Sequence, residues 1–223
     1  MNIVLILLCL VFAGIFIAVE HKQKYVPAVI LKGLASACFV ALGLITSKAC
    51  GDARIAKLVV TGLLLGAVAD ILLNLRFVFP EKIGSKVFLV GILVFLAGHI
   101  FYLAALIPHC PNVWLYIAAG AVLTALTMMW IFKKISAKKA FKIFGVFYIG
   151  AIMIMTCVAL GTLIGNGGKG HLMFFIGAVL FLVSDIVLIL NTFGKETKFS
   201  LRITNLTLYY LGQLTIAMSL LFF

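Results

Sequence analysis

Residues 171–190 read HLMFFIGAVLFLVSDIVLIL, a stretch of twenty positions whose only acid is Asp185. A helix that crosses a lipid bilayer needs about 20 predominantly apolar residues, so this stretch is long and apolar enough to span a membrane. Seven further runs of similar length and composition occur along the chain. The sequence therefore predicts an all-α, polytopic integral membrane protein with eight transmembrane helices.

The predicted spans cover residues 2–19, 26–47, 55–75, 87–107, 113–132, 141–165, 171–190 and 201–223. They leave only short connections, so we expect a single transmembrane domain over residues 1–223. The composition is 65% hydrophobic and 11% charged, against roughly 45–50% and ~25% in average soluble domains. A soluble protein of this size could not bury so much apolar surface, and a disordered chain would not contain it.

The chain has a net charge of +12, and most of its basic residues lie in the loops between apolar runs. Basic residues between apolar runs are a topology signal, so we expect no nucleic-acid partner. On the face that holds both termini, the basic loop residues are Lys48, Arg54, Lys57 and Lys169. On the other face they are Lys22, Lys24, Arg76, Lys82, Lys86, Lys133, Lys134, Lys138, Lys139, Lys142, Lys195, Lys198 and Arg202. The positive-inside rule predicts that the second face is cytoplasmic and that both termini are on the non-cytoplasmic side.

The first apolar run has no basic residue before it and is followed by Glu20, His21 and Lys22. A cleavable signal peptide has the reverse arrangement, so we expect an uncleaved first helix in a multi-pass protein of the cell membrane. We interpret the basic run from Lys133 to Lys139 mainly as a topology determinant. Binding of anionic lipid headgroups by this run is the alternative.

The five cysteines show no spacing typical of a metal site. Three of them, Cys9, Cys38 and Cys157, lie within apolar runs and are expected to be small core residues. Cys50 and Cys110 fall in two loops on the same predicted face, so a disulfide between them stays open.

Polar side chains inside the spans point to a function, because burying an acid or base near the bilayer centre costs about 2.5–3.5 kcal/mol. They are Lys32, Asp70, Asn74, His99, Tyr102, Tyr148, Asp185, Asn205, Tyr209, Tyr210 and Gln213. Most lie in the half of their span next to the predicted cytoplasmic face, whereas His99 and Tyr102 lie near mid-membrane. Because six helices contribute to the set, we expect one polar cavity that faces the cytoplasm.

Several of these residues also have a purely structural interpretation. Tyr148 and Tyr210 would be interfacial anchors, and the Lys32 side chain would extend to the membrane surface. Asn74 and Asn205 would form hydrogen bonds between helices, and His99 would be a packing residue. Asp70 and Asp185 are different, because a carboxyl group within a span is a functional candidate by default.

A pair of buried carboxyl groups suits general acid–base catalysis. Two carboxyl groups in an apolar cavity cannot both ionise cheaply, so one is expected to keep its proton. An acid beside a carboxylate can hydrolyse an acid-labile bond. A serine nucleophile is disfavoured because the chain has no GxSxG motif, and a zinc hydrolase is disfavoured because His99 is the only histidine deep in a span. We therefore interpret Asp70 and Asp185 as the catalytic pair.

Four segments look like the signature blocks of the YhhN family, whose animal members include lysoplasmalogenases. They are GAVADILL (66–73), GHIFY (98–102), GAVLFLVSD (177–185) and YYLGQ (209–213), in the family's order and spacing. The resemblance spans nearly the whole chain. It implies hydrolysis of the vinyl ether bond of lysoplasmalogen to a fatty aldehyde and a glycerophospho-amine, with Asp70 and Asp185 as the family's presumed catalytic pair.

Under this interpretation one aspartate protonates the vinyl ether, while the other stabilises the resulting cation and activates water. No cofactor or metal is needed. The supporting or substrate-binding residues would be Lys32, Asn74, His99, Tyr102, Tyr148, Tyr209 and Gln213. Lys32 would either meet the lipid phosphate or neutralise one aspartate. The expected partners are a lysophospholipid or another single-chain lipid, together with membrane lipids.

Other functions stay open. A proton-coupled transporter or lipid carrier could use the same acids, although alternating access needs a midplane site reachable from both sides. A lipid-binding scaffold would tolerate asparagine in place of Asp70 and Asp185. A hydrolase of another single-chain ether or amide lipid would keep the chemistry and change the substrate. The sequence leaves the oligomeric state open.

Overall fold

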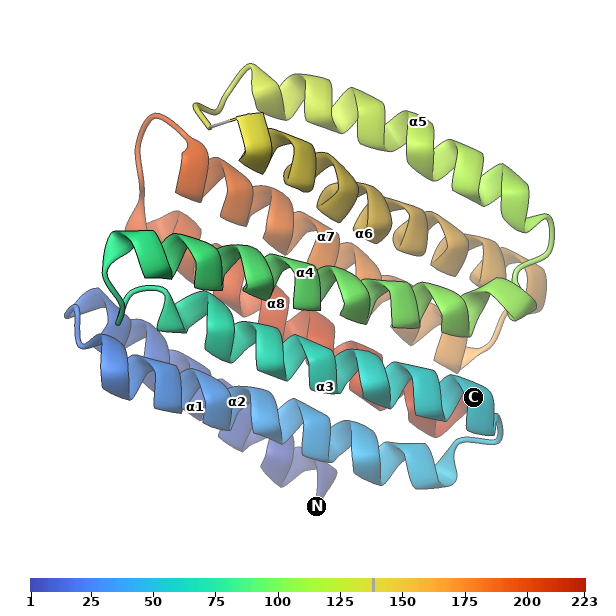
Figure 1. The fold of residues 1–223 in the computed structure, drawn as a ribbon. Helices are drawn as coiled ribbons and strands as arrows, with labels where there is room; N and C mark the ends of the chain where they lie inside the picture. The colour runs from blue at the N-terminus through green and yellow to red at the C-terminus, as the bar shows by residue number, and fades with distance from the viewer. Residues whose placement is uncertain (138) are drawn as a thin grey trace.

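The computed structural model of the chain describes residues 1–137 and 139–223, and the side chains of residues 139 and 140 lie outside that description. Within the described residues, eight long helices pack side by side (Figure 1). They are α1 (Asn2–His21), α2 (Tyr25–Thr46), α3 (Ala53–Leu75), α4 (Glu81–Leu106), α5 (Val113–Phe132), α6 (Lys139–Asn166), α7 (Lys169–Phe193) and α8 (Phe199–Ser219). All eight are long and apolar enough to cross a membrane. The predicted polytopic helical architecture is confirmed.

The observed helices follow the predicted spans, and several extend beyond them. The bounds of α5 agree at both ends, whereas α4 begins at Glu81 rather than at 87. Pro80 precedes this helix, and Glu81 lies in its first turn, where an acid interacts favourably with the helix dipole. The apolar run therefore marks the part of α4 that suits the bilayer core, while the helix itself starts earlier.

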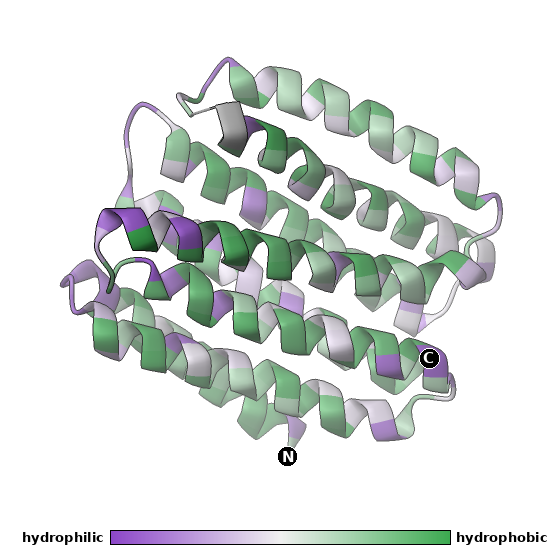
Figure 2. Cartoon of the chain, viewed as in Figure 1, coloured by the Kyte–Doolittle hydropathy of each residue, from purple (hydrophilic) through white to green (hydrophobic). Residues whose placement is uncertain are grey.

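Both termini lie at one end of the bundle (Figure 1). The opposite end, called the basic end below, holds the α1–α2, α3–α4, α5–α6 and α7–α8 connections. Figure 2 shows hydrophilic residues gathered towards the two ends of largely hydrophobic helices. That the basic end faces the cytoplasm stays a prediction, because the fold fixes which loops share an end and not which side of a membrane they face. Of the predicted basic run, Lys138 and the side chain of Lys139 lie outside the described residues.

The last helix occupies a central place in the bundle. α8 packs closely against α7 and also contacts α1, α2 and α3, whereas α5 lies at the edge and packs mainly on α6 (Figure 1). Large apolar side chains are exposed on the outer faces, including Trp114 at 78% and Ile3 at 72%. Such surfaces are expected where lipid replaces water as the solvent.

Glycines set the close approach of α7 and α8. A Cβ atom at Gly177 would lie 2.9 Å from the Gly212 carbonyl oxygen, and a Cβ atom at Gly212 would lie 3.0 Å from the Gly177 carbonyl oxygen. Small residues permit such contacts between helices in a membrane. The contact fixes the position of Asp185 on α7 relative to Tyr209 on α8.

Gly177→Val is therefore expected to force α7 away from α8 and to lower the midpoint of thermal unfolding in detergent, since overpacking a tight contact costs about 1–3 kcal/mol. Gly14→Val is the matched control, because a Cβ atom there has nothing within 4 Å. Equal unfolding midpoints for the two variants would contradict the importance of this contact.

All five cysteines, each among the described residues, are free thiols. The disulfide left open by the sequence is therefore not formed. The Cys50 thiol donates to the Asp52 carbonyl oxygen at 3.2 Å, and the Cys110 thiol donates to the Pro111 carbonyl oxygen at 3.6 Å. Burial raises the pKa of both thiols, which favours the less reactive protonated form.

Candidate active site

Two buried aspartates line one cavity in the half of the bundle next to the basic end. Asp70 on α3 is 2% exposed and Asp185 on α7 is 3% exposed. The other lining residues are Lys32, Leu73, Asn74, Arg76, Phe88, Phe95, Tyr148, Leu188, Arg202, Asn205, Leu206 and Tyr209. The cavity volume is about 40 Å³, which is enough to admit water. The predicted polar cavity therefore exists and contains both acids.

Asp70 is surrounded by hydrogen-bond donors. The Lys32 ammonium lies 3.0 Å from Asp70 Oδ1, and Oδ2 accepts hydrogen bonds of 2.6 Å from the hydroxyls of Ser36 and Tyr209. A cation and two hydroxyl donors stabilise a carboxylate at this position.

Lys32 is a buried part of the cavity wall. Its side chain is 6% exposed, so Lys32 does not extend to the surface. Besides its ion pair with Asp70, it donates to Asn74 Oδ1 at 3.3 Å. Of the two roles expected for Lys32, the geometry matches the neutralisation of an aspartate.

Asp185 has a different environment. Its Oδ2 accepts a hydrogen bond from the Tyr148 hydroxyl on α6. Among the described residues, no cation lies within ion-pair distance of Asp185 and no donor reaches its Oδ1 atom. A buried carboxyl group without a cation is costly to ionise. The two aspartates thus differ in the way that an acid and a base in one site must differ.

Three predicted supporting residues lie behind the cavity wall. The Tyr102 hydroxyl donates to Gln213 Oε1 at 2.9 Å, and Gln213 Nε2 donates to the Tyr209 hydroxyl at 3.5 Å. His99 Nδ1 donates to the Phe95 carbonyl oxygen at 2.8 Å, and its ring centroid lies 4.6 Å from that of Phe181. His99, Tyr102 and Gln213 are not among the described residues that line the cavity. His99 and Gln213 instead contact the lining residues Phe95 and Tyr209 from behind.

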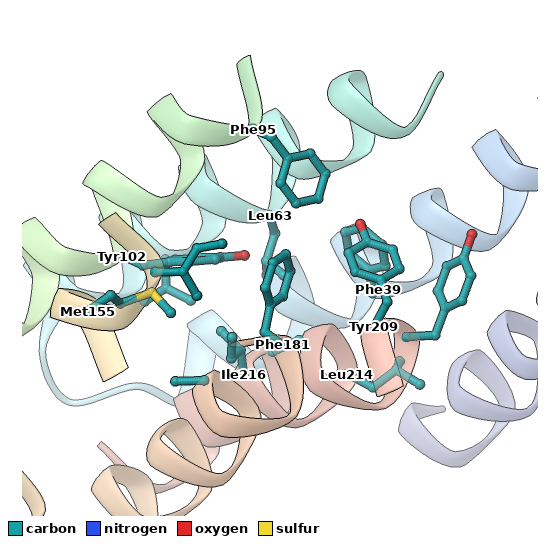
Figure 3. Packing of buried hydrophobic residues seen from close by; sticks show 14 of the residues in the cluster. Phe39, Leu63, Phe95, Tyr102, Met155, Phe181, Tyr209, Leu214 and Ile216 are labelled. Atoms are coloured by element: carbon teal, nitrogen blue, oxygen red, sulfur yellow. The ribbon is translucent and has the colours of Figure 1, made fainter. Parts of the chain in front are cut away.

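Aromatic rings form the inner side of the site. The ring centroids of Phe95, Phe181 and Tyr209 are separated by 5.5, 5.8 and 5.4 Å, and Figure 3 shows these side chains converging in the middle of the bundle. Tilted and edge-on contacts of this kind are favourable between rings. They place an apolar layer between the cavity and the half of the bundle that holds the termini.

The structural interpretations of two tyrosines are wrong. Tyr148 is 8% exposed and Tyr210 is 1% exposed, so neither is an interfacial anchor. The interhelical interpretation fits Asn205, whose amide donates to the Ser184 carbonyl oxygen at 3.0 Å and to the Ser184 hydroxyl at 2.8 Å. It also fits Asn74, whose amide donates to Glu20 on α1 at 3.0 Å.

Four charged or hydroxyl side chains that line the cavity or bond to its lining residues were outside the predicted polar set: Glu20, Ser36, Arg76 and Arg202. Ser36 lies one helical turn after Lys32, so its shared face was readable from the sequence. Glu20 accepts two hydrogen bonds from Arg202, at 2.8 and 2.9 Å, and this pair joins α1 to α8. Arg76 and Arg202 were interpreted only as loop charges that set the topology, although both line the cavity.

An apolar pocket adjoins the cavity. The two share Leu73, Phe88, Phe95, Tyr148 and Leu188. The rest of the pocket is lined by Ile92, Met128, Phe132, Ile135, Ala137, Phe141, Lys142, Gly145, Ile189, Thr192 and Phe193. A polar cavity beside a largely apolar pocket suits an amphiphilic ligand.

In the part of the chain that the structure describes, no three His, Cys, Asp or Glu side chains gather as metal ligands. Comparison with known proteins gives a match to the YhhN family over residues 27–220. No curated protein and no solved structure matches the chain. The matched range includes helices α3 to α8 and both cavity aspartates. The chain therefore belongs to the YhhN family.

Proposed function

We propose that this protein is a membrane-embedded hydrolase that cleaves the vinyl ether bond of lysoplasmalogen to a fatty aldehyde and a glycerophospho-amine. The observation that carries the proposal is the unlike environment of the two aspartates in one cavity. Asp70 is paired with the Lys32 ammonium at 3.0 Å, whereas Asp185 is bonded to the neutral Tyr148 hydroxyl. The adjoining apolar pocket supports a single-chain lipid as the substrate.

In the proposed reaction Asp185 is the acid. Tyr148 holds Oδ2, which leaves Oδ1 to carry the proton. Transfer of this proton to the β-carbon of the vinyl ether forms a C–H bond from the π electrons and leaves an oxocarbenium ion. A fixed carboxylate stabilises such a cation strongly where bulk water is excluded, and Asp70 is that carboxylate.

Water completes the reaction. A water molecule in the cavity attacks the oxocarbenium carbon and gives a proton to Asp70, which yields a hemiacetal. The hemiacetal then collapses to the aldehyde as its C–O bond to glycerol breaks. The glycerol oxygen takes the proton from Asp70, and the hemiacetal hydroxyl returns a proton to Asp185. Both aspartates end in their starting states.

A transporter fits the geometry less well. In the half of the bundle that holds the termini, the described buried hydroxyls of Thr46, Thr162 and Ser219 donate to backbone carbonyl oxygens. They are therefore used within the helices. The aromatic layer of Phe95 and Phe181 also lies between this half and the cavity. Alternating access requires a site reachable from both sides.

The test is aldehyde release by the purified protein in detergent. We expect aldehyde from lysoplasmalogen and none from an acyl lysophospholipid with the same headgroup, because an ester lacks the protonatable vinyl carbon. Coupling the aldehyde to an alcohol dehydrogenase gives a continuous absorbance signal. A folded protein that releases no aldehyde, yet moves protons across liposomes, would support the transporter instead.

A further inference from the structure

Of the three described cations that line the cavity, Lys32, Arg76 and Arg202, one has no ion-pair partner. Lys32 pairs with Asp70, and Arg202 pairs with Glu20 at 2.8 Å. Among the described residues, no acid lies within ion-pair distance of Arg76, and Arg76 Nε is buried with no hydrogen-bond partner. A buried polar group of this kind is costly unless a ligand completes it.

The Arg76 side chain is held in one place. Its guanidinium lies 4.4 Å from the ring centroid of Phe77 and 4.0 Å from that of Phe88. Burial lowers the pKa of Arg76 to about 10, and the positive charge of Arg202 contributes to the shift. The group is still charged at neutral pH. A weakly hydrated, planar guanidinium that packs against two rings is well suited to bind phosphate through paired N–H donors.

The position of Arg76 matches the dimensions of a lipid headgroup. Arg76 directly follows α3 at the basic end, where lipid phosphates of a bilayer lie. It lines both the cavity and an outer groove that includes Tyr25, Phe77 and Phe88. Asp70 lies six positions earlier, which is about 9 Å along the helix axis. A phosphate at Arg76 thus leaves the glycerol backbone to extend towards Asp70.

We propose that Arg76 binds the phosphate of a single-chain phospholipid at the mouth of the cavity and so selects phosphate-bearing lipids over neutral glycerol ethers. Lys32 is not available for this role, because it is occupied by Asp70 and Asn74. That the bound lipid is then cleaved rests on the proposed function, whereas the phosphate contact does not.

The experiment measures binding of a probe that cannot be hydrolysed. The probe is an alkyl-ether lysophosphatidylethanolamine, and its partner is the monoalkyl glycerol with the same chain and no phosphate. For the full-length protein in detergent, Arg76→Gln is expected to weaken binding of the probe about tenfold or more and to leave the monoalkyl glycerol unchanged. Arg76→Lys should recover part of the loss. Lys82→Gln, an exposed change on the same end of the bundle, is the matched control.

Each outcome decides the matter. Equal probe affinity in the wild type and Arg76→Gln overturns the proposal. Equal loss of both ligands also overturns it, because that result assigns Arg76 to packing against Phe77 and Phe88. Inorganic phosphate that binds the wild type as tightly as the probe would overturn the lipid as the source of the phosphate. If no aldehyde is released but Arg76→Gln still loses the probe selectively, the hydrolase proposal fails and the phosphate site stands.

Discussion

Asp185→Asn is expected to slow aldehyde release by about 10²–10⁴-fold while the protein stays folded. Asparagine has no proton to give to a vinyl carbon, and removal of a general acid slows a reaction by about 10²–10⁴-fold. Asp185 has no cationic partner among the described residues, so the change leaves no charge stranded. The Tyr148 hydroxyl can still donate to the asparagine oxygen. The coupled aldehyde assay and the thermal unfolding midpoint measure the two effects separately.

Tyr148→Phe provides the matched comparison for Asp185→Asn. It keeps the acid and removes only the hydrogen bond that orients it, so we expect a loss of about tenfold or less. The two variants thus separate proton donation from positioning. A wild-type rate in Asp185→Asn, or a greater loss in Tyr148→Phe than in Asp185→Asn, would remove Asp185 from the role of acid.

Asp70→Asn is expected to lose both activity and stability. The substitution strands the Lys32 ammonium, whose side chain is 6% exposed, and breaking a buried ion pair from one side costs about 3–5 kcal/mol. The unfolding midpoint should fall well below that of Asp185→Asn. The rate should fall as well, because no carboxylate then remains to stabilise the cation or to accept the proton of water.

A second substitution separates these two losses. Lys32→Met combined with Asp70→Asn removes the stranded charge and keeps a similar side-chain volume, so the unfolding midpoint should return towards the wild-type value. Aldehyde release should stay absent. A double variant that hydrolyses at the wild-type rate would show that Asp70 takes no part in the chemistry. A single Asp70→Asn variant as stable as the wild type would show that its pairing with Lys32 contributes little.

The helices could be predicted because the bilayer imposes a length and an apolar composition on each span. The helix ends could not be predicted as well. Hydropathy marks the part of a helix that suits the bilayer core, whereas residues that start or stop helices mark where the helix itself begins and ends. α4 illustrates the difference: its apolar run starts at 87, but Pro80 and Glu81 start the helix. The bounds of α5 agree because its start signals, Pro111 and the N-cap Asn112, come directly before its apolar run at Val113.

The cavity could be predicted from depth, because polar groups placed at one level of several helices have few neighbours other than one another. The depth of a residue along its helix did not show whether its side chain lines the cavity or lies behind the lining residues. Tyr209 lines the cavity, whereas Tyr102 turns to Gln213. The rotation of each helix about its axis decides this, and packing sets that rotation. The place of Arg76 in the cavity wall could not be predicted, because an arginine beside a span is equally typical of a topology-determining loop.

The groove that contains Arg76 lies at one end of the bundle, and the rings of Phe95 and Phe181 close the inner side of the cavity. Under the proposed function, this arrangement gives the site access to the lipids of one leaflet only. Substrate in the other leaflet must first cross the bilayer by flip-flop. The proposed hydrolase would therefore consume the half of a symmetric lipid pool in that leaflet at its own catalytic rate, and the other half no faster than transbilayer exchange delivers it.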